Sequence, residues 1–385
     1  MLLDQPVRDI RFTSSWRSGR ELAYIERVLD GGPLFGAGPF NERCAEWLRA
    51  YAGVPAALTT PSGTHALELA ALILGLEPGE EVIMPSFTFV STANAVALRG
   101  AVPVFVDVRA DTLNLDEDLI EAALSERTRA IVPVHYAGVS CAMDAISELA
   151  RDRRLAVIED AAHAIGCRYR GRVLGTIGDL GCLSFDGQKN VTCGEGGALL
   201  IGDQTLAGRA LNLQSKGTNR SEFLRGEVDR YEWVDLGSSF LPSEITAAFL
   251  AAQLESAGEI NARRRHIWEL YRRGLGELQS AGHLRLPTVP EECEHNGHLF
   301  YVLLEDPTRR PACLEHLRAR GIEAQSHYVP LHSSPAGRRL GRVAGAMPVT
   351  DTAAASLLRL PIHTGLSDDD VAYVIDGLSD ALRGA

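Results

Sequence analysis

The sequence predicts an α/β protein with a large, mainly parallel sheet and a smaller C-terminal α+β domain. Between residues 56 and 201, short apolar stretches alternate with helical patterns. This alternation is typical of βαβ units with helices on both faces of one sheet. It stops in a long helical pattern over residues 242–276. We therefore expect a large domain over residues 1–255 and a small domain over residues 256–385.

Each element follows from its local pattern. Residues 1–20 are irregular, and helices are expected at 20–29 and 43–51, around a Gly/Pro loop at 31–39. Strands of the large sheet are expected at 56–60, 81–85, 102–108, 130–134, 155–158, 182–185 and 197–201. The intervening helices are expected at 64–74, 90–98, 119–124 and 143–151.

The last two strands of the sheet have no helix between them, so a hairpin is expected there. A helix at 206–213 is followed by a polar segment at 215–231 and by the long helix. The small domain then begins with a strand at 299–304 and a helix at 310–320. An extended stretch at 323–329 and further helices up to residue 382 complete it.

The composition excludes several classes of protein. The chain has 385 residues, a hydrophobic fraction of 45% and a formal net charge of −12, which argues against a nucleic-acid binder but permits a locally positive pocket for an anion. The seven cysteines are scattered and contain no CxxC, so neither a disulfide frame nor a metal site is expected. The sequence has no signal pattern and no membrane-spanning stretch, so we expect a cytoplasmic protein without a membrane partner.

Lys189 is the first candidate catalytic residue. The chain has only two lysines, Lys189 and Lys216, among 38 basic residues. An ammonium group can lose its proton and form a Schiff base, whereas a guanidinium cannot. Composition alone is equally consistent with chance retention of two lysines in a chain that otherwise uses Arg. The position decides, because Lys189 follows a buried strand and a Gly-rich turn, where α/β proteins place chemistry.

Four other features allow a common interpretation. A carboxylate at a strand end, Asp160, suits a pyridinium nitrogen, although it equally suits a helix cap. Gly63 and Thr64 begin a helix whose N-terminus suits a phosphate, but an ordinary cap fits as well. Ser184 could donate to the same phosphate or be structural. Phe87 and Phe89 could stack on a planar ring or belong to the core. Together the features match the needs of pyridoxal 5′-phosphate (PLP).

The chain also resembles a known family. It is similar to the DegT/StrS sugar-nucleotide aminotransferases through the motifs PSGTHALELAAL, EVIMPSFTFVSTANAVALRGA, VPVHYAG, VIEDAAHAIG, FDGQKN and GEGGA. The later stretches KGTNRSEFLRGEVDRYEWVDLGSSFLPSE and HYVPLHSSPAG resemble the branch that aminates dTDP-4-dehydro-6-deoxyglucose. The resemblance implies fold type I, the aspartate aminotransferase-like architecture of PLP-dependent transferases. It also implies transfer of the amino group of glutamate to the 4-keto carbon of such a sugar.

Site residues follow from the resemblance. Lys189 would hold the cofactor as a Schiff base and later carry the proton, and Asp160 would pair with the pyridine nitrogen. Phe89 would stack on the ring. His163 stands where the family usually has Gln, which leaves its role open. The residues expected near the phosphate are Gly63, Thr64, His65 and Ser184.

The remaining expectations concern substrate and partners. Lys216 and Arg220 are candidates for the nucleotide diphosphate, or belong to a solvated loop. Tyr328 and His332 would line the sugar, or pack in the core. In relatives, a residue of the other subunit completes the phosphate site, so a homodimer with shared active sites is implied. No contact is carried over at Gly237 to Phe240, because many members have an Asn there.

Other activities of the same fold remain as alternatives. Sugar 3-dehydratases have His in place of the lysine, so Lys189 argues against them. A non-catalytic sugar-nucleotide binding protein on this fold is disfavoured by the retention of Lys189 together with Asp160. The sugar-branch motifs disfavour a desulfurase or an acyltransferase. Amination of a 3-keto hexose or of a 4-keto pentose remains open, since one methyl group contributes little to pocket contact.

Overall fold

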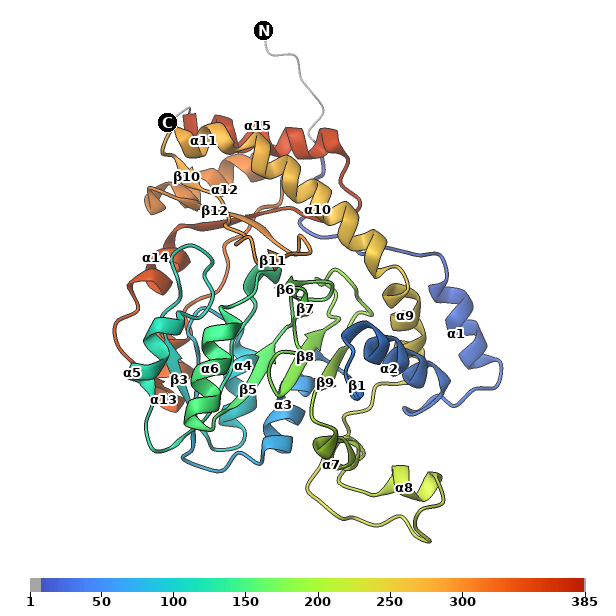
Figure 1. Ribbon diagram of the computed structural model, residues 1–385. Helices are drawn as coiled ribbons and strands as arrows, with labels where there is room; N and C mark the ends of the chain where they lie inside the picture. The colour runs from blue at the N-terminus through green and yellow to red at the C-terminus, as the bar shows by residue number, and fades with distance from the viewer. Residues whose placement is uncertain (1–7, 384–385) are drawn as a thin grey trace.

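The computed structural model describes residues 8–383, and its centre is an eight-stranded sheet flanked by helices on both faces (Figure 1). The strand order is β1-β9-β8-β5-β4-β2-β3-β13. The strands are β1 (Ala56–Thr60), β2 (Glu81–Pro85), β3 (Val102–Val106), β4 (Thr128–Ile131), β5 (Ala156–Asp160), β8 (Leu180–Ser184), β9 (Gly197–Ile201) and β13 (Arg342–Val343). The predicted α/β fold with a mainly parallel sheet is confirmed.

The centre of the sheet brings two chemically important strand ends together. Strand β5 pairs in parallel with β8, so that Asp160 stands opposite Cys182. Strand β9 runs antiparallel to both β8 and β1, which gives the hairpin expected between the last two strands. The connection of that hairpin carries Lys189. Asp160 and Lys189 therefore leave the same edge of the sheet from neighbouring strands.

Both faces of the sheet are covered because the strands are apolar on both sides. Successive residues of β5 show this, since Val157 belongs to one buried cluster and Ile158 to the other. The helices of this part are α1 (Glu21–Leu29), α2 (Pro39–Ala52), α3 (Gly63–Leu74), α4 (Val90–Ala97), α5 (Ile120–Ala123), α6 (Met143–Arg153), α7 (Gln204–Gln214), α8 (Arg220–Leu224) and α9 (Glu244–Leu254). Helix α3 packs on β8 and β9 and so points its N-terminus at the strand ends that carry the site.

The C-terminal part has its own sheet and its own core. Strands β10 (Leu284–Arg285), β12 (Phe300–Leu304) and β14 (Leu357–Leu360) form an antiparallel sheet in the order β10-β12-β14. Its helices are α10 (Ala257–Gly274), α11 (Gly276–Ser280), α12 (Arg310–Ala319), α13 (Pro335–Leu340), α14 (Pro348–Ser356) and α15 (Asp368–Arg383). A third small sheet joins β6 (Arg168–Tyr169) to β7 (Arg172–Val173) and to β11 (Cys293–Glu294). Helices α10 and α12 both pack on α15, as the upper part of Figure 1 shows.

Several elements differ from their sequence-based expectation. The single helix expected over residues 242–276 is divided near Ser256 into α9 and α10, because α9 packs on α1 and α2 whereas α10 packs on α15. The expected boundary near residue 256 falls in this break. The polar segment 215–231 contains α8, and the helical region up to residue 382 contains β13 and β14. Strand β13 is short and pairs with β3 at the edge of the large sheet. Its formation depends on tertiary packing, so the local sequence does not predict it.

Candidate active site

The site is a cavity of about 550 Å³ at the carboxyl ends of the central strands. Its walls come from both the large sheet and the C-terminal part. The residues that line it include Ser62, Gly63, Thr64, Phe89, Ser91, Asp160, His163, Ser184, Asp186, Lys189, Glu195, His298, Gln325, His327, Tyr328 and Arg359. Among the described residues, no group of three or more His, Cys, Asp or Glu side chains is arranged to hold a metal.

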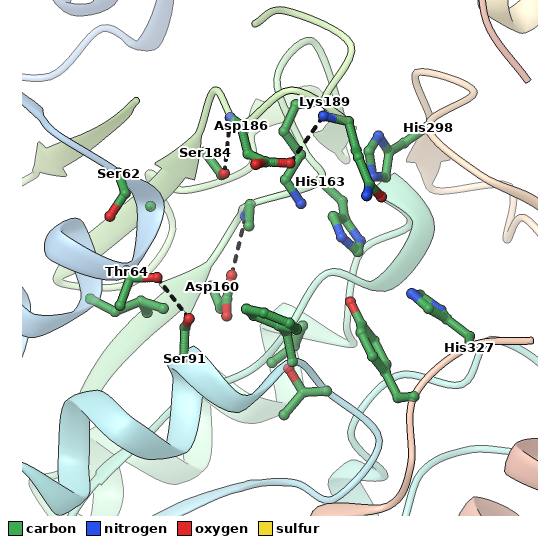
Figure 2. A pocket seen from close by; sticks show the side chains of 18 of the residues that line it. Ser62, Thr64, Ser91, Asp160, His163, Ser184, Asp186, Lys189, His298 and His327 are labelled. Atoms are coloured by element: carbon green, nitrogen blue, oxygen red, sulfur yellow. Dashed lines mark hydrogen bonds between the residues drawn. The ribbon is translucent and has the colours of Figure 1, made fainter. Parts of the chain in front are cut away.

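The amine of Lys189 lies inside this cavity. Figure 2 shows its side chain pointing into the space bounded by Asp160, His163 and His298. Burial lowers the pKa of Lys189 to about 8, and the charges of Asp160 and Asp186 only partly oppose that effect. An amine with such a pKa has a substantial neutral fraction near neutral pH, so it can act as a nucleophile and as a base.

Asp160 is a buried carboxylate held by two donors. The hydroxyl of Thr92 donates to Oδ2 at 2.8 Å, and the backbone N–H of Ala162 donates to Oδ1 at 3.2 Å. Burial raises the pKa of Asp160, whereas the two hydrogen bonds and the charge of Lys189 lower it. Fixed donors therefore orient the carboxylate, and the carboxylate faces the pocket. This arrangement suits an acceptor for a charged N–H donor.

Two neutral imidazoles stand beside Lys189 with opposite hydrogen-bonding character. The rings of His163 and His298 lie 4.2 Å apart between centroids, and burial moves the pKa of each well below its usual value. Nδ1 of His163 accepts the N–H of Ala137 at 3.3 Å, so its proton is assigned to Nε2. Nδ1 of His298 lies 2.9 Å from Oδ1 of Asn190 and carries the proton, which leaves Nε2 as an acceptor.

The opposite end of the pocket is the N-terminus of α3. Ser62 caps this helix by accepting the N–H of His65 at 3.1 Å, and Thr64 shares a 2.7 Å hydrogen bond with Ser91. The N–H groups of Gly63 and Thr64 belong to the first helical turn and have no partner within the helix. A Cβ at Gly63 would lie 2.7 Å from Cβ of Ser184, so only glycine permits this close approach. The arrangement suits a phosphate.

The structure brings most of the candidate residues from the sequence into one pocket. Seven of the eight cofactor candidates line it, together with Tyr328. Phe89 is 56% exposed at the start of α4, so its ring has an open face, whereas Phe87 is buried against Tyr136 and Tyr328.

The other four candidates do not line this pocket. His65 turns back onto Ser62, and its ring packs edge-on against Phe240. His332 shares a 2.7 Å hydrogen bond with Ser86. Lys216 and Arg220 belong to the segment around α8, which projects from the body of the chain in Figure 1.

Sequence reasoning missed several residues of the site. Thr92, Ser91, His298, Gln325, His327 and Arg359 were not among its candidates. Thr92 reaches Asp160 from a different βα unit, and His298 and Arg359 come from the C-terminal part. The local sequence around His298 and Arg359 carries no signal, since only the packing of the C-terminal part on the large sheet brings them to the pocket of Lys189.

Comparison with known proteins adds the family. The model of the DegT/DnrJ/EryC1/StrS aminotransferase family matches residues 17–379. The chain belongs to this family. GDP-perosamine synthase of Caulobacter vibrioides is 35% identical over 366 residues, which cover 94% of this chain and 96% of the relative. The structure of DesV from S. venezuelae has a TM-score of 0.87 at 36% identity and covers 95% of each chain.

A further structural relative bears on the cofactor. Spr1654 of Streptococcus pneumoniae, solved in a PLP-form, has a TM-score of 0.90 at 26% identity and covers 98% of each chain. The predicted enzyme class and cofactor are confirmed: the chain is a PLP-dependent aminotransferase of the sugar aminotransferase family, with the fold type I architecture. Within residues 8–383, no helix combines the length and apolar character that crossing a membrane requires.

Proposed function

We propose that the chain moves the amino group of glutamate to the 4-keto carbon of a dTDP-4-dehydro-6-deoxy-hexose in amino-sugar biosynthesis. The observation that carries amino transfer is the placement of Lys189 and Asp160 in one cavity. The choice of sugar rests on the stretches 216–244 and 327–337, which resemble the branch that aminates this class of substrate.

The residues present fit the cofactor. The Gly63 and Thr64 N–H groups, with the hydroxyl of Ser184, would hold the phosphate of PLP. Asp160 would accept from the pyridine nitrogen, and Phe89 would cover one face of the ring. His163 would donate from Nε2 to an oxygen of the ring. When bound, PLP supplies an electron sink that makes a carbanion next to nitrogen accessible.

Proton movement is assigned to Lys189. Its side chain would carry the cofactor covalently until the amino donor displaces it. The freed amine, with a pKa near 8, takes the α-proton of the donor and returns it within the same pocket. Thr92 and Ala162 donate to Asp160 and so favour its ionised form, which would keep the pyridine nitrogen of bound PLP protonated.

A GDP-linked keto sugar is the second candidate substrate. It is favoured by the 35% identity to GDP-perosamine synthase over 94% of this chain. The two candidates share the keto-sugar end and differ in the nucleotide. The same residues at Lys189 would therefore serve either substrate, and the nucleotide contacts would distinguish them.

We also propose a homodimer with shared active sites. Exposed apolar side chains gather on the 31–39 loop and on the segment around α8, namely Leu34, Phe35, Phe223, Leu224, Tyr231, Trp233, Val234 and Leu236. The guanidinium of Arg220 lies 5.5 Å from the Phe35 ring centroid, so the two segments form one surface. Burial of this surface in a second copy would bring Lys216 and Arg220 to the partner's pocket, where they would meet the nucleotide diphosphate. Tyr328 and His332 would act in their own chain's sugar site.

The test of the reaction is direct. Purified protein should be yellow, and L-glutamate should remove its cofactor band. Incubation with glutamate and a panel of dTDP- and GDP-linked keto sugars, followed by NMR of the product, identifies the nucleotide, the aminated carbon and an axial or equatorial amine. Lys189→Ala should lose the covalent cofactor band. An unchanged spectrum in that variant would end the proposal.

A further inference from the structure

A buried tyrosine outside the pocket is joined to a histidine that lines it. Tyr136 lies in the short helical turn Tyr136–Gly138 of the large domain, and its side chain is fully buried. Its hydroxyl lies 2.7 Å from Nδ1 of His327, which belongs to the C-terminal wall of the pocket. Among residues 8–383, this nitrogen is the only hydrogen-bond partner of the Tyr136 hydroxyl. Figure 2 shows the ring of His327 turned toward the pocket.

The contact determines which nitrogen of His327 carries the proton. Burial, together with the charges of Arg359 and Lys189, lowers the pKa of His327 to about 2, so the ring is neutral and has a single N–H. Burial also raises the pKa of Tyr136 well above its usual value, so its hydroxyl keeps its proton. If Nδ1 carried the N–H, the hydroxyl proton would have no acceptor in a dry environment, which is costly. Tyr136 therefore donates to Nδ1, and the proton of His327 lies on Nε2.

The ring of His327 is also held in one plane. It stacks on Tyr328 with centroids 3.7 Å apart and an interplanar angle of 24°, and Phe87 meets it edge-on at 6.3 Å. Its Nε2 makes no hydrogen bond to any residue between 8 and 383, and the ring lines the pocket. His327 therefore presents an N–H group of fixed direction that has no acceptor in the described protein, so the acceptor is expected on a ligand.

The character of this donor restricts the group that it binds. A neutral N–H suits the uncharged oxygens of a sugar, whereas a carboxylate or a phosphate is bound more strongly by a cation or a helix N-terminus. His327 also borders a second hollow of about 300 Å³, whose lining includes Ser326, Val329 and Pro330. Val329 is largely exposed, so His327 stands between the pocket and the molecular surface. The substrate that reaches from the pocket to the surface is the nucleotide sugar, because it is much larger than an amino acid.

We propose that Nε2–H of His327 donates to an oxygen of the keto sugar, and that Tyr136 is the positioning residue that keeps this proton on Nε2. This inference rests on the proposed sugar aminotransferase function and names residues that recognise the acceptor substrate. Without the Tyr136 hydroxyl, both tautomers of the neutral ring are populated, and only one of them donates to the sugar.

The experiment follows the two half-reactions of the holoenzyme separately by stopped-flow absorbance. L-glutamate removes the cofactor band. The band is restored from the aminated form by dTDP-4-dehydro-6-deoxyglucose, or by a GDP-linked keto sugar if wild type prefers it. The variants are Tyr136→Phe, His327→Asn, His327→Gln and the double variant Tyr136→Phe/His327→Gln. The Asn side chain reaches only the position of Nδ1, whereas Gln carries an N–H to the position of Nε2.

Tyr271→Phe is the matched control for the loss of a buried hydroxyl. Tyr271 is as buried as Tyr136, and its hydroxyl donates to the carbonyl of Pro361 at 2.8 Å. Neither Tyr271 nor Pro361 lines the pocket. This variant should therefore match wild type in both half-reactions.

The expected losses fall on the keto-sugar step alone. Tyr136→Phe should slow restoration of the band roughly fivefold and His327→Asn roughly tenfold, the effect of one hydrogen bond to a bound ligand. His327→Gln should stay within about twofold of wild type, since it keeps a donor at the pocket. In the double variant, removal of the Tyr136 hydroxyl should have no further effect, because the amide does not need it to place its N–H. The reaction with glutamate should be unchanged in every variant.

A second measurement determines the tautomer without turnover. In protein labelled isotopically at the histidine nitrogens, NMR chemical shifts distinguish a ring nitrogen that carries a proton from one that does not. The signal missing from His327→Gln identifies His327. Wild type should carry the proton on Nε2, and Tyr136→Phe should show both tautomers. A proton on Nδ1 of His327 in wild type overturns the inference.

The outcomes separate this inference from the proposed function. Equal rates with the keto sugar in wild type, Tyr136→Phe and His327→Asn overturn the inference and leave the aminotransferase function standing. A loss confined to the reaction with glutamate also overturns it, because His327 would then contact the amino donor. A wild-type enzyme that transfers nitrogen to none of the keto sugars defeats the proposed function and the sugar contact together. Because the two half-reactions are compared within each variant, a partial loss of folded protein does not imitate the expected result.

Discussion

Oδ1 of Asn190, the residue after Lys189, lies 2.9 Å from Nδ1 of His298. The amide of Asn190 is oriented by its other end, which donates to Oδ1 of Asn261 at 2.9 Å and to the carbonyl of Asn296 at 3.1 Å. The loop that carries the catalytic amine is thus joined to the C-terminal part by buried polar contacts. These contacts also determine which nitrogen of His298 faces the pocket without a proton.

Replacement of Asn190 should therefore destabilise the protein. In Asn190→Leu, the Nδ1–H of His298 and the acceptors on Asn261 and Asn296 lose their partner. We expect a loss of about 3 kcal/mol in the free energy of unfolding, since buried polar groups without partners are costly. Urea unfolding followed by fluorescence measures it. Asn94→Leu, at an exposed position of α4, should change stability by less than about 0.5 kcal/mol. Equal effects of the two substitutions would contradict this account.

Thr92 should act as a positioning residue for Asp160. Its hydroxyl donates to the ionised carboxylate at 2.8 Å, and such a bond holds the pKa of Asp160 down against the effect of burial. In Thr92→Val the pKa of Asp160 should rise, so the acidic limb of the activity profile should move to higher pH. We expect kcat/KM near neutral pH to fall roughly tenfold. Thr92→Ser keeps the hydroxyl and should retain the wild-type profile. A profile that does not move in Thr92→Val would refute the role.

Part of this site could be predicted from the sequence and part could not. Asp160 and Lys189 follow neighbouring parallel strands, and the carboxyl ends of such strands meet at one edge, so their proximity was predictable. The place of the α3 N-terminus in the site was predictable too, because Gly63 and Thr64 directly follow another strand of the large sheet. His298 and Arg359 were not, because their approach depends on how the C-terminal part packs on the large sheet. That packing leaves no periodic pattern in the sequence.

Gly63 should be required for cofactor binding. Its Cβ position lies 2.7 Å from Cβ and 3.0 Å from Oγ of Ser184, so an alanine must push the helix N-terminus and the serine apart. We expect Gly63→Ala to raise the dissociation constant of PLP by roughly tenfold or more, as overpacking of a close contact does. Fluorescence titration of cofactor-depleted protein measures it. Gly208→Ala in α7 is the control, because nothing lies within 4 Å of its Cβ position. Unaltered PLP affinity in Gly63→Ala would show that the N-terminus of α3 does not hold the phosphate of PLP.

The buried amine of Lys189 should make stability depend on pH in a defined direction. In the cofactor-free chain its pKa is about 8, below the value of 10.5 for an exposed lysine. Above pH 8 the unfolded chain therefore binds more protons at this position than the folded chain, so the folded state gains stability as the pH rises from 8 to 10.5. Relative to Lys189→Met, which cannot titrate, cofactor-free wild type should gain about 2–3 kcal/mol over that interval. Chemical unfolding at several pH values measures the difference, and a difference that stays constant or falls with pH would show that the amine is not held in a dry pocket.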